Sequence, residues 1–219
     1  MKSFIPWIGG KSQLAKRIIL EFPTDFERYI EVFGGGASIL FASDKHAPIE
    51  VYNDANGQLV NLFRCLKYHR EELQKEIRYY LNSREMFADC RSRLESSGTT
   101  DIQRAAMYYV CVKTSFGADT DSFGCAPKSL DTARFEDIEK RLERVLVEHK
   151  DFEELIKQYD RPNALFYCDP PYHTTEKHYS ERFTEADHYR LNTVLKALKG
   201  RFILSYNDDD FVRELYKDF

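Results

Sequence analysis

The sequence lacks any long apolar run, although 42% of its 219 residues are hydrophobic. A membrane-spanning helix needs about 18 or more consecutive apolar residues, so a membrane protein is excluded. Residues 1–20 carry Lys11, Lys16 and Arg17 and contain no apolar signal core. The hydrophobic share is too high for a disordered polymer, and the length suits one large domain, with or without an insertion. The small net charge of -4 argues against a generic polyanion binder but leaves a local basic face open.

The cysteines and histidines lack the spacing of a disulfide-rich or metal-bound fold. The five cysteines are an odd number, widely separated, and no CxxC pair occurs. We therefore expect neither a disulfide framework nor a zinc module, and a reducing cytoplasm is the expected compartment. His173, His178 and His188 have a spacing that matches no common ligand pattern, so no metal site is expected.

Two glycine-containing segments each lack one residue of a nucleotide-binding motif. Gly10-Lys11-Ser12 resembles the end of a phosphate loop, yet Ile5 stands where that loop needs its first glycine. Gly34-Gly35-Gly36 follows a strand-like run, but Ile39 occupies the sixth position of the dinucleotide fingerprint. A nucleoside triphosphatase and a pyrophosphate-containing cofactor are therefore both disfavoured.

The N-terminal part does have the order of a nucleotide-binding βαβ unit: strand, glycine turn, helix, strand and acidic residue. In chain order these segments are Tyr29–Phe33, Gly34 to Gly36, Ala37–Ser43, Pro48–Tyr52 and Asp54. Glycines after a strand let the backbone approach a ligand closely, and a carboxylate after the next strand suits ribose hydroxyls. A tight turn followed by an ordinary surface aspartate is the alternative.

The rest of the chain divides into a helical stretch, an irregular stretch and a return to alternating elements. Residues 59–112 show the apolar steps of amphipathic helices, and Thr100 or Asp101 is expected to cap the last of them. Residues 113–134 lack this period, and two Ser-Phe-Gly runs there predict a hairpin or a compact loop. Helices are then predicted over Phe135–Leu146, Asp151–Tyr159, Glu185–Lys199 and Asp209–Tyr216, and strands over Asn163–Cys168 and Arg201–Ser205. This alternation indicates an α/β fold with a mostly parallel sheet covered on both faces.

Asp169-Pro170-Pro171-Tyr172 follows a predicted buried strand, the position where open α/β sheets bind their ligands. The two prolines fix φ and remove two N–H donors, so the turn is stiff and its carbonyls point outward. A carboxylate and a rigid carbonyl together can accept both hydrogens of an amino group. Tyr172 offers a flat face for a planar base. The motif therefore indicates chemistry on a base amine, and an incidental proline-rich turn is the alternative.

Three separated segments resemble the Dam-like (D12 class) DNA adenine N6-methyltransferases. They are Phe4–Lys11, Glu31–Ser38 with Asn53-Asp54, and Asp169–Tyr172, in the family's order and across almost the whole chain. The resemblance implies a Rossmann-like, S-adenosylmethionine-dependent methyltransferase sheet at residues 1–58 and 136–219. It implies a helical target-recognition insert at residues 59–135. The implied reaction moves a methyl group from S-adenosylmethionine to N6 of an adenine flipped out of duplex DNA.

The resemblance also assigns site residues. The implied cofactor-binding set is Trp7, Lys11, Phe33, Gly34, Gly35, Gly36, Asp54 and Asp169, in which Asp54 holds the ribose hydroxyls. The implied catalytic set is Asp169, Pro170, Pro171 and Tyr172. Lys113, Lys128 and Arg134 flank an acidic hairpin tip and are the candidates for DNA phosphate contacts.

Other interpretations stay open at this point. A catalytically impaired or truncated DNA-binding relative would keep the fold without methyl transfer, because family members continue beyond the position of Phe219 with a further strand pair. A cytosine N4 methyltransferase also acts on an exocyclic amine, although aspartate at position 169 favours adenine by resemblance. A bacterial or phage-encoded protein acting on DNA is expected, and a cognate restriction endonuclease of the same system is a candidate partner.

Overall fold

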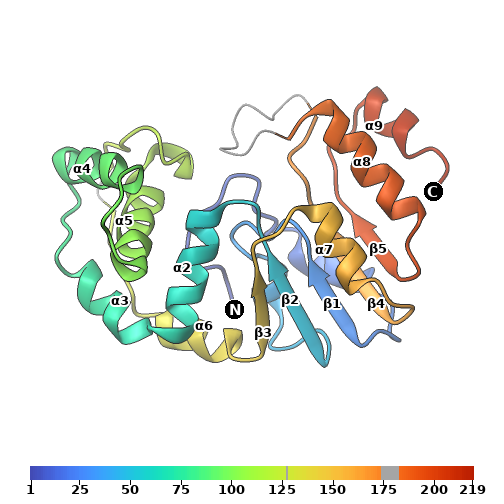
Figure 1. Cartoon of the computed structure of the whole chain (residues 1–219), viewed down its shortest axis with the longest axis horizontal. Coiled ribbons are helices and arrows are strands. Elements are labelled where there is room, and N and C mark those ends of the chain that lie inside the picture. The colour runs from blue at the N-terminus through green and yellow to red at the C-terminus, as the bar shows by residue number, and fades with distance from the viewer. Residues whose placement is uncertain (127, 174–182) are drawn as a thin grey trace.

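The computed structural model describes residues 1–126, 128–173 and 183–219, and within these ranges it has one sheet of five parallel strands (Figure 1). The spatial order of the strands is β3-β2-β1-β4-β5. Their bounds are β1 (Arg28–Glu31), β2 (Ile49–Asn53), β3 (Val145–Glu148), β4 (Ala164–Cys168) and β5 (Arg201–Leu204). The predicted parallel α/β fold is therefore confirmed.

The central strand β1 pairs with β2 on one side and with β4 on the other. From β1 the chain adds β2 and β3 in one direction, and then β4 and β5 in the other. Such a reversal leaves a crevice at the carboxyl ends of the strands, where open α/β sheets bind their ligands. The fold thus places the residues after β1, β2 and β4 around one crevice.

Both faces of the sheet are apolar and covered by helices, as a parallel sheet requires. Because successive strand residues point to opposite faces, Tyr29 and Tyr52 belong to one core and Ile30 and Val51 to the other. The first core includes side chains of α2 (Gly57–Tyr68), α5 (Asp101–Thr114) and α6 (Phe135–Leu142). The second includes side chains of α7 (Phe152–Tyr159) and α8 (Glu185–Lys196).

The helical stretch packs around α5, which is buried along most of its length. Its start confirms the prediction: Thr100 accepts a hydrogen bond from Gln103 N, and the Gln103 side chain accepts one from Thr100 N. Helix α2 lies between α5 and the sheet, where its Phe63 stacks on Tyr52 of β2 with ring centres 4.2 Å apart. The remaining helices are α1 (Ala15–Leu20), α3 (Arg70–Ile77), α4 (Arg84–Leu94) and α9 (Asp210–Leu215). None of the described helices is long and apolar enough to cross a membrane.

The hairpin predicted between α5 and α6 is confirmed. Phe116 N donates to Ser122 O over 2.8 Å, and Ser115 and Phe123 form an antiparallel bridge. A short 3-10 turn, η2 (Phe116–Ala118), forms one side of the hairpin tip.

Two predicted elements are wrong. The helix expected over Ala37–Ser43 is only a 3-10 turn, η1 (Leu40–Ala42), because Ala37 has φ of +54° and this left-handed residue interrupts a right-handed helix. The helix expected over Phe135–Leu146 ends at Leu142, and strand β3 begins at Val145. Pairing along the β2 edge, with β-branched residues at 145 and 147, overrides the helical continuation there.

Candidate active site

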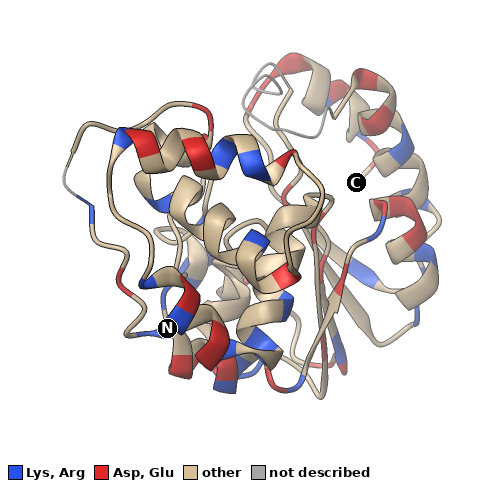
Figure 2. Ribbon diagram, turned by 60° about the vertical axis from the view of Figure 1, so that its left-hand side comes forward, with Lys and Arg blue, Asp and Glu red and all other residues tan. Residues whose placement is uncertain are grey.

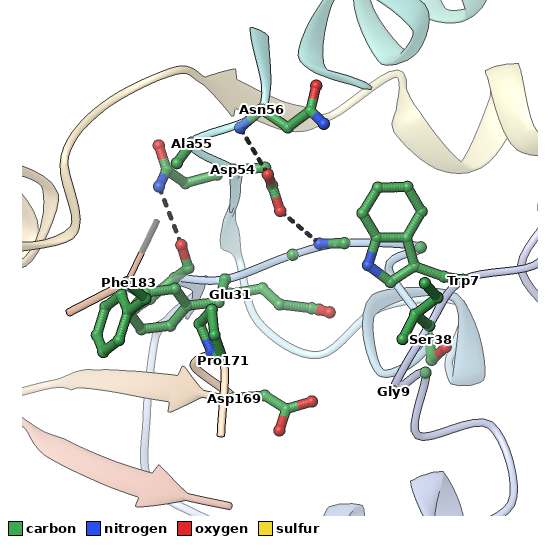
Figure 3. A pocket seen from close by; sticks show the side chains of 18 of the residues that line it. Trp7, Gly9, Glu31, Ser38, Asp54, Ala55, Asn56, Asp169, Pro171 and Phe183 are labelled. Atoms are coloured by element: carbon green, nitrogen blue, oxygen red, sulfur yellow. Dashed lines mark hydrogen bonds between the residues drawn. The ribbon is translucent and has the colours of Figure 1, made fainter. Parts of the chain in front are cut away.

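A cavity of about 270 Å³ opens at the carboxyl ends of β1, β2 and β4, where the strand order reverses (Figure 3). Its volume is near the lower end, about 300 Å³, of pockets that bind small molecules. Every residue of the sequence-derived cofactor set lines it, although these residues come from the N-terminal segment, the strand ends and the segment after β4. The fold therefore brings the whole set together.

The glycine corner, Gly34 to Gly36, turns the chain from β1 along the cavity. Gly35 has φ of +48°, in the left-handed region. A Cβ on Gly34 would overlap the ring of Tyr52, and one on Gly35 would overlap the indole of Trp7. The Tyr52 hydroxyl also donates to the Gly35 carbonyl over 2.8 Å. Glycine is required here because two aromatic side chains pack directly against the backbone.

Asp54 follows β2 and bridges the glycine corner to the start of α2 (Figure 3). Its Oδ2 accepts a hydrogen bond from Gly35 N over 2.7 Å, and its Oδ1 accepts one from Asn56 N over 2.8 Å. The neighbouring Asn53 side chain exchanges hydrogen bonds of 2.9 and 3.1 Å with the backbone of Lys150, just before α7. The Asp54 carboxylate is therefore held in one orientation at the cavity wall.

Lys11 and Asp169 form an ion pair on the cavity, with Nζ and Oδ2 2.7 Å apart and side chains 11% and 15% exposed. Lys11 Nζ also donates to Gly9 O over 2.8 Å and lies 4.7 Å from the centre of the Tyr172 ring. Burial opposes the charge of Lys11, but Asp169 and Tyr172 raise its pKa, so it stays a cation. Burial raises the pKa of Asp169, and Lys11 counteracts this shift.

The Asp-Pro-Pro-Tyr motif directly follows β4, as the sequence predicts. Pro170 is buried and Pro171 lines the cavity beside Asp169. The Tyr172 ring lies 5.9 Å from the Tyr206 ring, at an interplanar angle of 30°. An aromatic surface thus adjoins the carboxylate.

Glu31, the last residue of β1, is a cavity residue that the sequence analysis missed. It is 2% exposed, and its Oε2 accepts hydrogen bonds from Tyr29 Oη over 3.0 Å and from Leu40 N over 2.8 Å. Its side chain extends toward the same space as Asp169, with Trp7 on the other side of that space (Figure 3). Burial raises the pKa of Glu31 to about 8. Its sequence signal is that it is the only charged residue in the run Tyr29–Phe33.

The opposite wall comes from the starts of α7 and α8 and was also missed. Phe152 and Phe183 line the cavity and pack on Phe33, with ring centres 5.6 and 5.7 Å from it. Arg190 of α8 lies 4.7 Å from the centre of the Phe152 ring and donates to Asp151 Oδ1 over 2.8 Å. This wall depends on packing between segments that are far apart in the sequence, and no local motif predicts such packing.

The segment expected to recognise DNA also contributes to the cavity. Tyr108 of α5 and the hairpin-tip residues Ala118–Thr120 line it. The two tip residues that flank Asp119 have positive φ of 67° and 62°. The Asp119 carboxylate accepts hydrogen bonds from the backbone N–H groups of Asp121 and Ser122, over 2.9 and 3.1 Å. The tip is therefore a tightly bonded turn beside the cavity.

The three candidates for phosphate contacts lie near one another, around Asp131, and away from the cavity lining. Lys128 Nζ donates to Ser115 O over 2.6 Å, and Arg134 donates to carbonyls of the N-terminal segment. Burial lowers the pKa of Lys113, and the two neighbouring cations lower it further. Figure 2 shows basic and acidic positions intermixed along the helices of this part of the chain.

The histidines considered for metal binding have other contacts. His173 Nδ1 lies 3.2 Å from Asp209 Oδ2, and His188 Nδ1 is hydrogen-bonded to the Tyr206 hydroxyl. His178 lies outside the described residues. Within the described ranges, no group of three or more His, Cys, Asp or Glu side chains is arranged to hold a metal ion.

Comparison with known proteins identifies the class. The model of the D12 class N6 adenine-specific DNA methyltransferase family matches residues 7–219, and the chain belongs to this family. It is 30% identical to the Type II methyltransferase M1.LlaDCHI of Lactococcus lactis subsp. cremoris, covering 100% of this chain and 86% of that protein. It is 26% identical to the Type II methyltransferase M.CviBI of Paramecium bursaria Chlorella virus NC1A, covering 100% and 88%. It is 24% identical to the Retron Ec67 DNA adenine methylase of Escherichia coli, covering 100% and 82%. The protein is therefore an adenine-specific DNA methyltransferase, as the resemblance implied.

Proposed function

We propose that the cavity binds S-adenosylmethionine. The observation that carries this proposal is the charge of the lining, in which five aspartates outnumber two lysines, while the sixth carboxyl group, Glu31, is protonated at neutral pH. S-adenosylmethionine carries a sulfonium and an ammonium against a single carboxylate and is a net cation, whereas a nucleoside triphosphate presents several negative charges. Lys11, the residue of the incomplete phosphate loop, is already paired with Asp169. The site therefore favours a cationic ligand over a triphosphate.

The positions of the lining residues suggest which part of the cofactor each of them would contact. Asp54, whose carboxylate is fixed by two backbone N–H groups, would accept hydrogen bonds from the ribose hydroxyls. The glycine corner, with the Trp7 indole packed against it, and Phe33 would face the methionine part. When bound, S-adenosylmethionine supplies a methyl group that its sulfonium has already activated.

The Asp-Pro-Pro-Tyr motif is proposed to orient the target amine. The lone pair of an adenine amino group is delocalised into the ring, so the amine is a poor nucleophile. Hydrogen bonds from this amine to the Asp169 carboxylate and to the Pro170 carbonyl would localise the lone pair and direct it. Good alignment of two reacting groups contributes about 7–11 kcal/mol to lowering a barrier.

The target adenine is proposed to leave the DNA helix during the reaction, because the duplex conceals its amino group. Extrusion of a base costs a few kcal/mol. Stacking on Tyr172, beside Tyr206, would return about 1–3 kcal/mol. The motif would thus both hold the base and orient its amine.

The division of the chain into a catalytic part (residues 1–58 and 136–219) and a target-recognition insert (residues 59–135) remains our proposal. In support, residues 59–135 form helices and a hairpin, and contribute no strand to the sheet in the described ranges. Lys113, Lys128 and Arg134 lie close enough to interact electrostatically, and they would contact DNA phosphates together. The hairpin tip would then face both the DNA and the cofactor cavity.

The test is methyl transfer from labelled S-adenosylmethionine to mixed-sequence duplex DNA, followed by digestion and identification of the modified nucleoside. We expect N6-methyladenine, and mapping of the modified positions defines the target sequence. Asp169→Ala should lower the rate about 100-fold or more, since it removes a group aimed at the reacting amine, while melting temperature stays close to that of the wild type. Wild-type turnover in this variant would overturn the proposed role of Asp169.

The remaining alternatives give different results in the same assay. Cofactor binding without any methylated product would support a DNA-binding relative that has lost catalysis. N4-methylcytosine would keep the proposed mechanism and contradict the base assignment. Calorimetric titration with S-adenosylmethionine measures binding independently of turnover.

A further inference from the structure

Each oxygen of the Asp169 carboxylate has its own donor, and the two donors come from opposite ends of the chain. Lys11 Nζ donates to Oδ2 over 2.7 Å, and Ser205 Oγ donates to Oδ1 over 2.7 Å. Ser205 is the first residue after β5. A single hydrogen bond leaves a carboxylate able to turn about its Cβ–Cγ bond, whereas a donor on each oxygen fixes its plane.

Ser205 is itself held in place by β4. Its backbone N donates to Cys168 O over 2.9 Å, which extends the β4–β5 pairing by one step. Its Oγ lies 3.1 Å from the Tyr167 hydroxyl. A hydroxyl has one hydrogen to donate, and an ionised carboxylate only accepts, so the direction of the chain is defined. Tyr167 donates to Ser205, and Ser205 donates to Asp169.

We infer that Ser205 is a positioning residue for methyl transfer: it fixes the plane and favours the ionised form of Asp169 without touching the substrate. Ser205 does not line the cavity, so its effect on the amine passes through Asp169. This inference rests on the proposed role of Asp169 as an acceptor for the target amine. It gives a function to a residue that sits 36 positions from the motif it serves.

The electrostatic surroundings of Asp169 determine how loss of this hydroxyl would appear. Burial raises its pKa, while Lys11, Ser205 and Tyr172 lower it. On the neighbouring strands, Glu31 and the Tyr167 hydroxyl also interact electrostatically with Asp169. Removing the Ser205 hydroxyl removes one group that favours the carboxylate, so the pKa of Asp169 rises. If methyl transfer needs ionised Asp169, its rate falls as the pH is lowered through the pKa of Asp169. This falling part of the pH–rate profile, the acid limb, should therefore lie at higher pH in the variant than in the wild type.

The experiment compares four variants of the full chain: Ser205→Ala, Ser205→Cys, Ser205→Thr and Tyr167→Phe. Alanine removes the donor, cysteine keeps the size with a weak donor, and threonine keeps the hydroxyl. Tyr167→Phe keeps the ring and removes only the donor to Ser205. Single-turnover methyl transfer is measured across pH on the duplex that the wild type methylates. Calorimetry gives the S-adenosylmethionine affinity and the melting temperature.

We expect Ser205→Ala to slow single-turnover transfer about 10- to 100-fold, the range for one hydrogen bond to a charged group. Its acid limb should move to higher pH, with cofactor affinity and melting temperature close to the wild-type values. Ser205→Cys should behave similarly, which keeps the test open if the alanine variant does not fold. Ser205→Thr should restore most of the rate, and Tyr167→Phe should cause a smaller loss in the same direction.

Three results would overturn the inference. The first is a wild-type rate and acid limb in folded Ser205→Ala or Ser205→Cys. The second is a slower Ser205→Ala whose acid limb is not shifted and whose melting temperature and cofactor affinity are both lower. A purely structural role of Ser205 predicts this combination. The third is a folded Ser205→Thr that is as slow as the alanine variant. Failure of the proposed function is separate, because it would appear as methyl transfer that persists in Asp169→Ala.

Discussion

Two ion pairs lie largely away from solvent, and their surroundings differ. Arg141 of α6 and Glu50 of β2 are each 4% exposed in their side chains, and the guanidinium donates to both Glu50 oxygens over 2.8 and 2.7 Å. Arg141 also donates to the carbonyls of Ser43 and Leu40, over 2.9 and 3.0 Å. Lys11 and Asp169 instead border a cavity. The first pair is surrounded by hydrogen-bond partners from the protein, whereas the second borders the cavity.

Glu31 interacts electrostatically with one member of each pair and has no cation within ion-pair distance among the described residues. Asp169 raises its pKa and Arg141 lowers it, but burial dominates. The three carboxylates show how partners determine a role. Glu50 is surrounded by hydrogen-bond donors and stabilises the fold. Asp169 also has donors but borders the cavity. Glu31 is protonated at neutral pH.

The largest expected effect is on stability, from breaking the enclosed pair. Arg141→Met leaves Glu50 buried without its partner and should lower the free energy of unfolding by about 3–5 kcal/mol. Methyl transfer per folded molecule should stay unchanged, because the pair lies outside the cavity. Urea unfolding followed by circular dichroism measures the first quantity. The double variant Arg141→Met/Glu50→Leu is the control and should recover much of the loss; equal instability in both variants would contradict this interpretation.

The next effect depends on pH and concerns Glu31. The unfolded carboxyl ionises near pH 4.5, whereas the folded one keeps its proton up to about pH 8. The native state therefore binds more protons in this window, and Glu31 makes the wild type less stable as pH rises. Glu31→Gln mimics the protonated group, so it should be more stable than the wild type by about 3 kcal/mol at pH 7. Melting curves at several pH values should converge near pH 4.5; a constant difference would contradict the raised pKa.

A smaller effect on the free-energy scale is expected from the open pair. Lys11→Met removes a group that favours ionised Asp169, so transfer should slow about 10-fold or more. The loss of stability should be smaller than in Arg141→Met, because Asp169 borders the cavity and keeps its contact with Ser205. Rate and unfolding are measured on the same preparation. A stability loss as large as that of Arg141→Met, with an unchanged rate, would remove the distinction between the two pairs.

The sequence predicts the positions of those site residues that belong to short local motifs. The glycine corner, Asp54 and Asp169–Tyr172 each follow a strand, and parallel strands bring their carboxyl ends to one edge. Trp7 and Lys11 were placed by resemblance to the family, and they line the same cavity. Local order and fold class therefore predict where the motifs after the strands lie, whereas the expectation for Trp7 and Lys11 needs the resemblance to the family.

The rest could not be predicted because it depends on contacts between distant segments. Phe183 reaches the cavity only because α8 packs beside α7, and Ser205 reaches Asp169 only because β5 pairs with β4. Strand β3 was missed because four residues directly after a helix carry too little periodicity to be separated from it. Glu31 does carry a sequence signal, because it is the one charged residue in the apolar run Tyr29–Phe33.

Trp7 is the only tryptophan in the chain, and its indole packs against the glycine corner at the cavity. Light that selectively excites tryptophan therefore reports on this one place and on no other part of the fold. A ligand that enters or leaves the cavity changes the environment of the emitting ring itself. Under the proposed binding of the methyl donor in this cavity, its arrival and departure would change the emission of Trp7 and could be followed in real time without any label on donor or DNA.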